Sequence, residues 1–358
     1  MKVCLIAGAR PNFMKIGPVM AGLRDHAVEP VLVHTGQHYD DAMSAVFFDE
    51  LRLPRPAHDL GVGPGSPVSQ LAAIMLALEP VLLAGRFDVV VVVGDVTSTL
   101  AGALVAARCG IDVAHVEAGL RSFDDTMPEE LNRVVVDRVS RVLYAPSTDA
   151  VANLADEGIG GRRVVMVGNV MVDTLLDNLE RARARGVAAS LGFEPGGYVL
   201  ATLHRPSNVD QPARLAGLLR ALGEIAVRRP VVFPLHPRTR RRLEASGISV
   251  PPGVHLAEPL GYLDFLGLQA DSALVITDSG GVQEETTVLG VPCLTVRPNT
   301  ERPITVSEGT NELVGTDPDR VIRRALARID ERRGAKRPPL WDGKAGRRIA
   351  DDLVTRYG

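Results

Sequence analysis

The sequence is poor in cysteine and in long uncharged runs, and each shortage excludes a class of protein. Its only three cysteines are scattered singly in apolar stretches, at Cys4, Cys109 and Cys293. Isolated cysteines are typical of reduced core thiols, so neither a disulfide framework nor a zinc site is predicted. No apolar run approaches the roughly 20 residues of a membrane span, and the start MKVCLIAGARP lacks a signal-peptide cleavage site. We therefore expect a cytoplasmic protein without membrane insertion.

A strong excess of either charge is also absent. The 40 Lys and Arg residues nearly balance the 43 Asp and Glu residues, which gives a formal net charge of −3 at pH 7. This balance disfavours a general nucleic-acid binder but leaves room for a local basic pocket that holds phosphate. Lysine itself is scarce, and Lys15 is the single lysine between residues 3 and 335. Its place beside the first glycine turn is due either to chance or to a demand for a compact ammonium group.

Apolar strands alternate with amphipathic helices from end to end. Continuous Val, Leu and Ile runs are typical of parallel strands covered on both faces, and a first series lies at residues 3–7, 30–34, 89–93, 114–117, 142–145 and 164–167. A second series lies at residues 198–202, 231–234, 254–256, 273–277 and 292–296. This alternation predicts an α/β protein with two doubly wound, Rossmann-like parallel-sheet domains. We expect the domains at residues 1–170 and 171–340, followed by a last helix at 341–358.

Acidic side chains stand where two strands of the first series end and where the next helix begins. Asp95 follows strand 89–93, Glu117 ends strand 114–117, and Glu129 lies in the helix start MPEE. Any one of them alone is more often a helix cap or another structural carboxylate. Parallel strands bring their carboxyl ends to one edge of a sheet, so we expect the three acids at one site. Proton transfer beside a phosphate leaving group needs such an arrangement.

The second domain carries the more informative anion motif. Strand 273–277 runs into DSGG at residues 278–281 and then into a helix. Glycines permit close approach of a ligand, so the helix amides can hold a diphosphate, and Glu285 one turn later can accept hydrogen bonds from ribose hydroxyls. The spacing matches neither a Walker A loop nor a Rossmann GxGxxG motif. In the first domain, Arg10 and Lys15 follow the turn at Gly8 closely and make a second, weaker anion signal.

Short blocks spread over most of the chain resemble those of the non-hydrolysing UDP-N-acetylglucosamine 2-epimerases. In chain order they are GARPNFMK, TGQHYD, VVVGDVTSTLA, HVEAGLR, MPEELNR, LHRP, ITDSGGVQEE, GVPCLTVR and TERP. The resemblance implies the GT-B architecture, in which two Rossmann-like domains face a central cleft and a C-terminal helix packs back on the N-terminal domain. It also implies a homodimer that takes a UDP-N-acetylhexosamine as its substrate.

The resemblance further implies a role for each matching residue. The positions that match catalytic ones are Asp95, Glu117, Glu129 and His204. Those counted as binding the UDP-sugar are Arg10, Lys15, Arg133, Arg205, Phe265, Ser279, Gly280, Gly281, Glu285 and Arg302. The implied reaction eliminates UDP to give 2-acetamidoglucal and adds it back with the C2 proton on the other face. It needs no metal and no other cofactor, because fixed cations hold the diphosphate and no hydride moves; which acid removes the proton and which returns it stays open.

Three other functions remain as alternatives to the non-hydrolysing epimerase. A hydrolysing 2-epimerase would release N-acetylmannosamine and UDP, and the intact EAGLR and PEELNR blocks disfavour it. A GT-B glycosyltransferase would share the UDP site but would not require three acids in the first domain. A catalytically silent UDP-sugar binder is favoured only if Asp95, Glu117 or Glu129 is missing, and all three are present.

Overall fold

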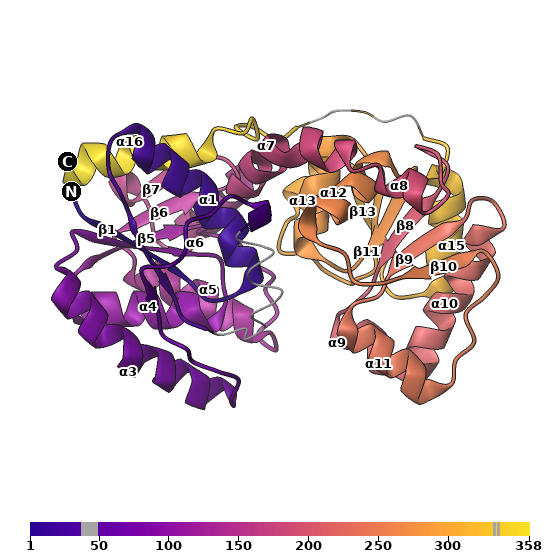
Figure 1. Ribbon diagram of the computed structural model, residues 1–358, viewed down its shortest axis with the longest axis horizontal. Coiled ribbons are helices and arrows are strands. Elements are labelled where there is room, and N and C mark those ends of the chain that lie inside the picture. The colour runs from indigo at the N-terminus through magenta and orange to yellow at the C-terminus, as the bar shows by residue number, and fades with distance from the viewer. Residues whose placement is uncertain (37–48, 332–333, 335–336) are drawn as a thin grey trace. The chain divides into compact units, whose positions relative to one another are not determined.

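The computed structural model describes residues 1–36, 49–331, 334 and 337–358, and the chain divides into two compact units (Figure 1). Unit 1 comprises Met1–Asp177 and Pro339–Gly358, and unit 2 comprises Asn178–Pro338. The predicted boundary after residue 170 lies at the start of helix α7 (Val170–Ala184), whereas the units divide within this helix. A boundary inside a continuous helix leaves no Gly or Pro turn signal in the sequence.

Unit 1 is built around a seven-stranded parallel sheet with the order β3-β2-β1-β4-β5-β6-β7. Its strands are β1 (Val3–Ala7), β2 (Val31–His34), β3 (His58–Asp59), β4 (Val89–Val93), β5 (Asp112–Val116), β6 (Val142–Ala145) and β7 (Val164–Met166). The five valines of β4 are all fully buried, because helices cover both faces of the sheet. The order of strands reverses between β1 and β4, and ligands of doubly wound sheets bind at the carboxyl ends beside such a point.

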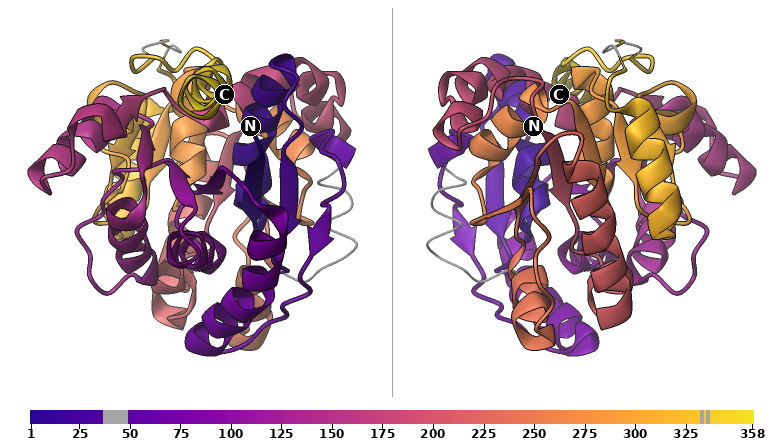
Figure 2. Two further views of the ribbon diagram at one scale, coloured as in Figure 1. Left: turned by 90° about the vertical axis from the view of Figure 1, so that its left-hand side faces the viewer. Right: turned by 90° about the vertical axis from the view of Figure 1, so that its right-hand side faces the viewer.

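Two layers of helices cover this sheet, as the side view in Figure 2 shows. The helices of unit 1, besides α7, are α1 (Arg10–Asp25), α3 (Pro67–Gly85), α4 (Thr97–Arg108), α5 (Pro128–Val139), α6 (Thr148–Asp156) and α16 (Ala345–Tyr357), with a 3-10 turn η1 (Gly161–Arg163). Helices α1 and α16 share a core with alternate residues of the central strands. Helices α3, α4 and α5 pack on the residues that point to the other face.

The last helix, α16, belongs to unit 1 and packs along α1. Its first turn is capped from α7, because the carboxylate of Asp173 accepts hydrogen bonds from the backbone N–H groups of Ala345 (3.2 Å) and Gly346 (2.8 Å). The helices come close together at Gly346, where an added Cβ would lie 2.5 Å from the carbonyl carbon of Pro18. Both chain termini therefore lie in unit 1 (Figure 1).

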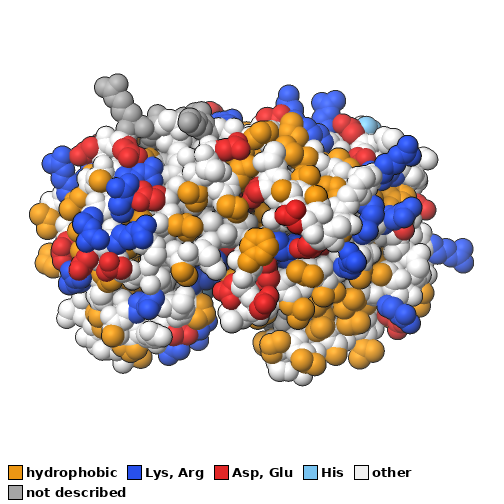
Figure 3. Space-filling model, turned by 180° about the vertical axis from the view of Figure 1, so that it is seen from behind, with side chains coloured by type: hydrophobic (Ala, Val, Ile, Leu, Met, Phe, Trp, Pro, Cys, Tyr) orange, Lys and Arg blue, Asp and Glu red, His pale blue; other side chains and the backbone are white. Residues whose placement is uncertain are grey.

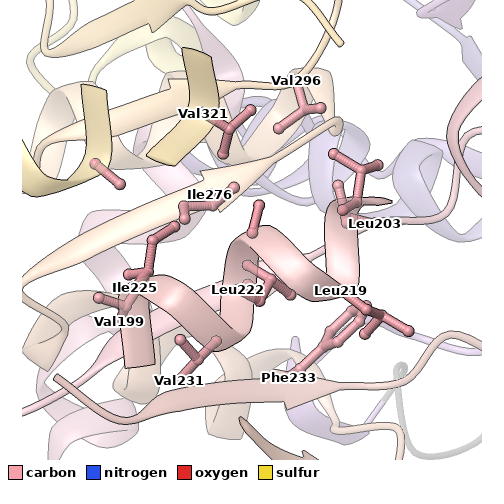
Figure 4. Packing of buried hydrophobic residues seen from close by; sticks show 14 of the residues in the cluster. Val199, Leu203, Leu219, Leu222, Ile225, Val231, Phe233, Ile276, Val296 and Val321 are labelled. Carbon is pink, nitrogen blue, oxygen red and sulfur yellow. The ribbon is translucent and has the colours of Figure 1, made fainter. Parts of the chain in front are cut away.

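Unit 2 repeats the design with a six-stranded parallel sheet in the order β10-β9-β8-β11-β12-β13. Its strands are β8 (Val199–Thr202), β9 (Val231–Pro234), β10 (Val254–Ala257), β11 (Leu274–Thr277), β12 (Cys293–Thr295) and β13 (Asn311–Leu313). Its helices are α8 (Val187–Ser190), α9 (Pro206–Val209), α10 (Pro212–Ala226), α11 (Pro237–Ser246), α12 (Tyr262–Asp271), α13 (Gly280–Leu289), α14 (Ile304–Ser307) and α15 (Pro318–Arg328). Figure 4 shows its main core, where Leu219 and Leu222 of α10 pack on Phe233 and Ile276 of the sheet.

The α/β class with two parallel sheets is confirmed, and the differences from the predicted elements are local. Strands β3 and β13 were not predicted, because edge strands of two or three residues are too short to show an apolar pattern. Strand β5 ends at Val116, so Glu117 lies just beyond the strand, with a positive φ of 71°. The expectation that no apolar run nears membrane length is wrong for α3. By length and composition alone, its 19 residues are long and apolar enough to cross a membrane.

Candidate active site

In unit 1, the turns after β1 and β4 are tied together by one buried amide. The side-chain oxygen of Asn12 accepts hydrogen bonds from the backbone N–H groups of Gly8 (3.1 Å) and Ala9 (3.0 Å). Its amide nitrogen donates to the carbonyl of Val93, the last residue of β4, at 3.1 Å. Asn12 therefore fixes the two sides of the switch point relative to each other, and it does so from within the GARPNFMK block.

A buried ion pair between Lys15 and Glu117 lies next to the turns that Asn12 joins. The ammonium of Lys15, on α1, bonds Oε2 of Glu117, and both residues are almost completely buried. The pair occupies the space beside Gly94, where an added Cβ would lie 2.8 Å from Nζ of Lys15 and 3.4 Å from Oε2 of Glu117. Oε1 of Glu117 is buried without a hydrogen-bond partner among the described residues. One carboxylate oxygen is therefore held by a cation, and the other is left for a ligand.

Asp95 is held by an arginine on helix α5. Arg133 donates two hydrogen bonds to Oδ2 of Asp95, from Nε at 3.0 Å and from Nη2 at 2.7 Å, and a third to Glu130. Glu130 also accepts hydrogen bonds from the backbone N–H groups of Ser122 and Phe123. Burial opposes the charge of Glu130, but these donors together with Arg133 bring its pKa below the ordinary value. The loop that follows β5 is thereby linked to the Asp95 turn through Arg133.

The other predicted site residues of unit 1 are less well defined. The side chain of Glu129 is partly exposed in the first turn of α5 and makes no hydrogen bond or ion pair within the described part of the chain. The side chain of Arg10, and residues 37–40 of the TGQHYD block, lie outside the described residues. Unit 1 thus brings Lys15 to Glu117 and Arg133 to Asp95. No group of three or more His, Cys, Asp or Glu side chains is placed to hold a metal in the described ranges.

In unit 2, a buried aspartate organises the turn that carries His204. The carboxylate of Asp278 accepts hydrogen bonds from the backbone N–H groups of His204 (3.0 Å) and Arg205 (2.9 Å) and from the amide of Asn208 (3.0 Å). Nδ1 of the His204 ring also lies 3.0 Å from Asp278. Burial raises the pKa of Asp278, but His204 and the other donors outweigh it, so the pKa falls below its ordinary value.

Helix α13 begins directly after Asp278, in the DSGG turn. Its N-cap residue, Ser279, makes no side-chain cap, so the first backbone N–H groups of the helix have no side-chain acceptor from it. A Cβ added at Gly281 would meet no atom within 4 Å, whereas one added at Gly280 would lie 2.8 Å from both Arg302 and Glu301. The start of α13 is therefore open at Gly281 and closely packed at Gly280.

Arg302, at the other side of Gly280, is held in a buried charge network. Its guanidinium forms ion pairs with Glu284 (2.8 Å) and Glu301 (2.7 Å), and Arg297 also forms an ion pair with Glu301, at 2.9 Å. Arg205 reaches the same carboxylate from the His204 turn, at 3.8 Å. Burial opposes the charge of Glu301, but the arginines lower its pKa well below the ordinary range. This network orients arginines at the carboxyl edge of the second sheet, as anion binding requires.

Glu285, the predicted ribose ligand, is buried in a different environment. Burial, with a contribution from the neighbouring Glu284, raises the pKa of Glu285 to about 8. Tyr262 hydrogen-bonds this carboxyl group, and Gln269, in the amide orientation that satisfies both of its ends, donates to it at 2.9 Å. A carboxyl group that is neutral at pH 7 donates as well as accepts, whereas the sequence predicted an acceptor only. Phe265, on α12, packs partly buried against the adjacent core.

The sequence pattern did not identify five residues whose hydrogen bonds hold the turns of the two units in place. Each lies inside or beside one of the blocks that carry the family resemblance. They are Asn12, His115, Arg121, Asp137 and Asp278. His115 had the clearest local signal, because it is the one polar side chain in the interior of strand β5, DVAHV. A fully buried polar residue needs partners, and these partners are distant in the chain.

Known proteins share the sequence and the fold of this chain over nearly its full length. The family model described as UDP-N-acetylglucosamine 2-epimerase matches residues 21–354. A UDP-N-acetylglucosamine 2-epimerase of Methanocaldococcus jannaschii is 42% identical over 100% of both chains. A UDP-2,3-diacetamido-2,3-dideoxy-D-glucuronate 2-epimerase of Pseudomonas aeruginosa is 40% identical over 99% of both. The crystal structure of the M. jannaschii enzyme with UDP-GlcNAc and UDP superposes with a TM-score of 0.91, covering 99% of this chain and 100% of that one.

This likeness covers nearly the full length of both chains, so it applies to both units and not to one Rossmann-like half. The two doubly wound sheets are those of a GT-B-like fold. The chain belongs to the UDP-N-acetylglucosamine 2-epimerase family.

Proposed function

We propose that this protein interconverts UDP-N-acetylglucosamine and UDP-N-acetylmannosamine in the cytoplasm, without hydrolysing them. The observation that carries the proposal is the buried Lys15–Glu117 pair beside the turn of Asp95, with Oε1 of Glu117 unpartnered. A buried carboxylate oxygen without a partner is costly unless a ligand uses it. Free thiols at Cys4, Cys109 and Cys293 suit the reducing cytoplasm.

The proposed reaction is an elimination followed by an addition. A carboxylate removes the proton from C2 of the sugar, the bond between C1 and the diphosphate oxygen breaks, and 2-acetamidoglucal and UDP form. UDP then adds back to C1 while an acid returns a proton to the opposite face of C2. Glu117 is supported as one of the two proton carriers by its unpartnered oxygen, and Asp95 and Glu129 remain the candidates for the other.

Unit 2 supplies groups suited to the departing diphosphate. The open first turn of α13 at Gly281 offers backbone N–H groups and the positive end of a helix dipole. Nδ1 of His204 lies 3.0 Å from Asp278, a contact that orients the imidazole ring. Arg205 and Arg302 add fixed positive charge on the same edge of the sheet. We propose that this set binds the UDP of the substrate.

A second substrate is favoured by one specific observation. The P. aeruginosa relative that acts on a UDP-2,3-diacetamido-2,3-dideoxy-D-glucuronate is 40% identical, against 42% for the M. jannaschii UDP-N-acetylglucosamine 2-epimerase. Such a small difference does not separate the two sugars. The chemistry at C2 is the same for both, so the same acids serve either substrate.

Deuterium incorporation tests the proposal. The protein is incubated with UDP-N-acetylglucosamine in D2O, and C2 of both epimers is followed by NMR, with the diacetamido uronate run in parallel. We expect deuterium at C2 of both UDP-N-acetyl sugars, because the removed proton exchanges with solvent before re-addition. Retention of the original C2 proton during interconversion would rule out the elimination. Release of free N-acetylmannosamine would instead indicate a hydrolysing enzyme, and turnover of the uronate alone would favour the second substrate.

We also propose that the protein forms a homodimer through helix α3. This helix buries Ile74, Leu78 and Leu82 against its own unit but exposes Leu76 (74%) and Leu83 (59%) on the other side. Hydrophobic side chains gather over this part of unit 1 in Figure 3. As the crossover between β3 and β4, α3 is fixed in the fold, and a two-fold interface uses the same patch on both copies, so we propose that its nearly uncharged face pairs with itself. A second copy of the chain therefore fits it without a partner of opposite charge.

A further inference from the structure

We infer that His115 is a positioning residue of the proposed reaction, a doubly protonated imidazolium that holds the turns carrying Asp95 and Glu117. The inference rests on the proposed function and deepens it. His115 lies in β5 with no exposed side-chain surface, two residues before Glu117. It acts through the backbone of both turns, so it is a positioning residue and not a catalytic one.

Both ring nitrogens of His115 face oxygen atoms. Nε2 lies 2.8 Å from the carbonyl oxygen of Gly94, and Nδ1 lies 2.6 Å from Oδ1 of Asp137 on α5. A carbonyl oxygen accepts hydrogen bonds only, and so does an ionised carboxylate. A neutral imidazole has a single N–H and satisfies one of these two acceptors. The geometry therefore requires a proton on each nitrogen if Asp137 is ionised.

The surroundings of Asp137 keep it ionised. Its second oxygen, Oδ2, accepts hydrogen bonds from the guanidinium of Arg121 (2.7 Å) and from the backbone N–H of Gly119 (3.0 Å). The pKa of Asp137 lies below its ordinary value although burial opposes the charge, and Arg121 and the N–H of Gly119 stabilise the carboxylate independently of His115. Arg121 in turn bonds Glu157 at 2.6 Å. Two cations and two carboxylates thus balance, which makes the buried charges tolerable.

This network ends on the backbone of both acid-bearing turns. Gly94, whose carbonyl His115 holds, precedes Asp95 and has a positive φ of 68°. Gly119, whose N–H Asp137 holds, comes two residues after Glu117 and has a φ of 83°. The imidazolium is therefore a side-chain link between the Asp95 turn, β5 and the Glu117 turn, beside the backbone hydrogen bond from the N–H of Gly94 to the carbonyl of Val116. Without its second N–H, one buried acceptor loses its donor and the turn that carries it is held less firmly.

The protonation state is tested by NMR on the full-length protein with 15N-labelled histidine at pH 8. An exposed histidine is neutral there, because its pKa is about 6.5. We expect one of the eight histidines to show N–H protons on both ring nitrogens, and we expect this signal to be missing from His115→Gln. A single N–H on the His115 ring at pH 8 would overturn the inference. This measurement needs no substrate and no activity, so it is independent of the proposed function.

The positioning role is tested by comparing His115→Gln with Tyr144→Phe. The control removes a buried hydroxyl in the neighbouring strand β6 that bonds Asp352 at 2.9 Å, and its side chain lies in the core shared with α1 and α16, on the other face of the sheet from His115. We expect kcat of epimerisation to fall about a hundredfold in His115→Gln, as small misplacements of reacting groups do, with the Kd for UDP unchanged. The control loses stability without losing kcat.

Equal kcat in the two variants would make His115 merely structural and overturn the inference. If His115→Gln does not fold, the NMR result on the unmodified protein decides alone. If the unmodified protein shows no epimerisation or C2 exchange, the proposed function fails while the protonation of His115 is still measured. The two failures are thereby distinguished.

Discussion

Single side chains in unit 1 are held by charge pairing that leaves particular atoms unused. Lys15 compensates one oxygen of Glu117 and leaves Oε1 without a partner, whereas Asp278 in unit 2 is bonded from several directions. A carboxylate that is saturated with donors positions its neighbours, and one with an open oxygen can exchange a proton. This contrast separates Glu117 from Asp278, although both follow a strand of a parallel sheet.

Glu117→Gln is predicted to slow turnover strongly while leaving UDP binding intact. The change removes a proton carrier and no phosphate ligand, so we expect kcat to fall by about 100- to 10,000-fold, with the Kd for UDP within a fewfold of the original. Steady-state turnover assays measure kcat, and calorimetry with UDP measures the Kd. Glu29→Gln, on an exposed carboxylate paired with Arg24, is the control and should keep both values. Near-normal turnover in Glu117→Gln would assign Glu117 a structural role.

Gly281→Val is predicted to abolish UDP binding without unfolding the protein. A Cβ at Gly281 meets no atom within 4 Å, so the side chain fits the protein but occupies the space in front of the helix amides. We expect UDP affinity to fall at least about a hundredfold, as when two charge-assisted hydrogen bonds are lost. Gly160→Val, at another open glycine, is the control. Unchanged UDP affinity in a folded Gly281→Val protein would place the nucleotide elsewhere.

Helices α7 and α16 show how one buried carboxylate joins two elements that are distant in the sequence. Asp173 of α7 caps the first turn of α16, and burial raises its pKa from 3.8 to about 6. A carboxyl group with a raised pKa binds more protons in the folded state than in the unfolded state. Stability is therefore lost as pH rises from about 4 to 6, and the cost of the buried charge persists above that range.

Asp173→Asn is predicted to flatten this dependence on pH. The amide does not titrate, so we expect the free energy of unfolding of the variant to decline less between pH 4 and 6.5, by up to about 3 kcal/mol for a shift of two pKa units. Urea unfolding at a series of pH values measures it. Asp25→Asn, on an exposed carboxylate near the end of α1, serves as the control. Parallel curves for the unmodified protein and Asp173→Asn would show that the carboxylate is ionised without cost.

At the scale of the whole molecule, the proposed functional residues are divided between two similar parallel sheets. Unit 1 holds acids at the carboxyl ends of β4 and β5, and unit 2 holds a helix N-terminus and arginines at the corresponding edge. The carboxyl ends of parallel strands meet at one edge of each sheet, so the same architecture carries both the proposed proton-transfer residues and the proposed anion-binding residues. Unit 1 alone also presents the apolar face of α3.

Leu76→Glu is predicted to convert the proposed homodimer into a monomer. A carboxylate in the centre of an apolar two-fold interface meets its own copy, and the burial of two like charges is unfavourable. Light scattering after size-exclusion chromatography should give half the molar mass. Val227→Glu, at a residue of unit 2 that is 90% exposed, should leave the mass unchanged. The same mass for Leu76→Glu and the unmodified protein would exclude α3 as the interface.

The sequence by itself determined the elements whose cause is local. The five valines of β4 predict a strand covered on both faces, and the DSGG turn predicts an open helix start, because both depend on neighbouring residues. The same patterns, through their family resemblance, indicated the GT-B-like fold and the family. The roles of Asp95, Glu117, Glu129 and His204 stay predictions.

Only the tertiary structure decided which polar groups pair. Asn12 reaches a carbonyl 81 positions away, His115 reaches a carboxylate 22 positions away, and Asp278 caps a turn 74 positions earlier. Each is a buried polar side chain that requires a partner, but its own neighbours in the sequence do not specify which one. Strand order in the parallel sheets brings these partners together, and order across a sheet is a property of packing and not of local pattern.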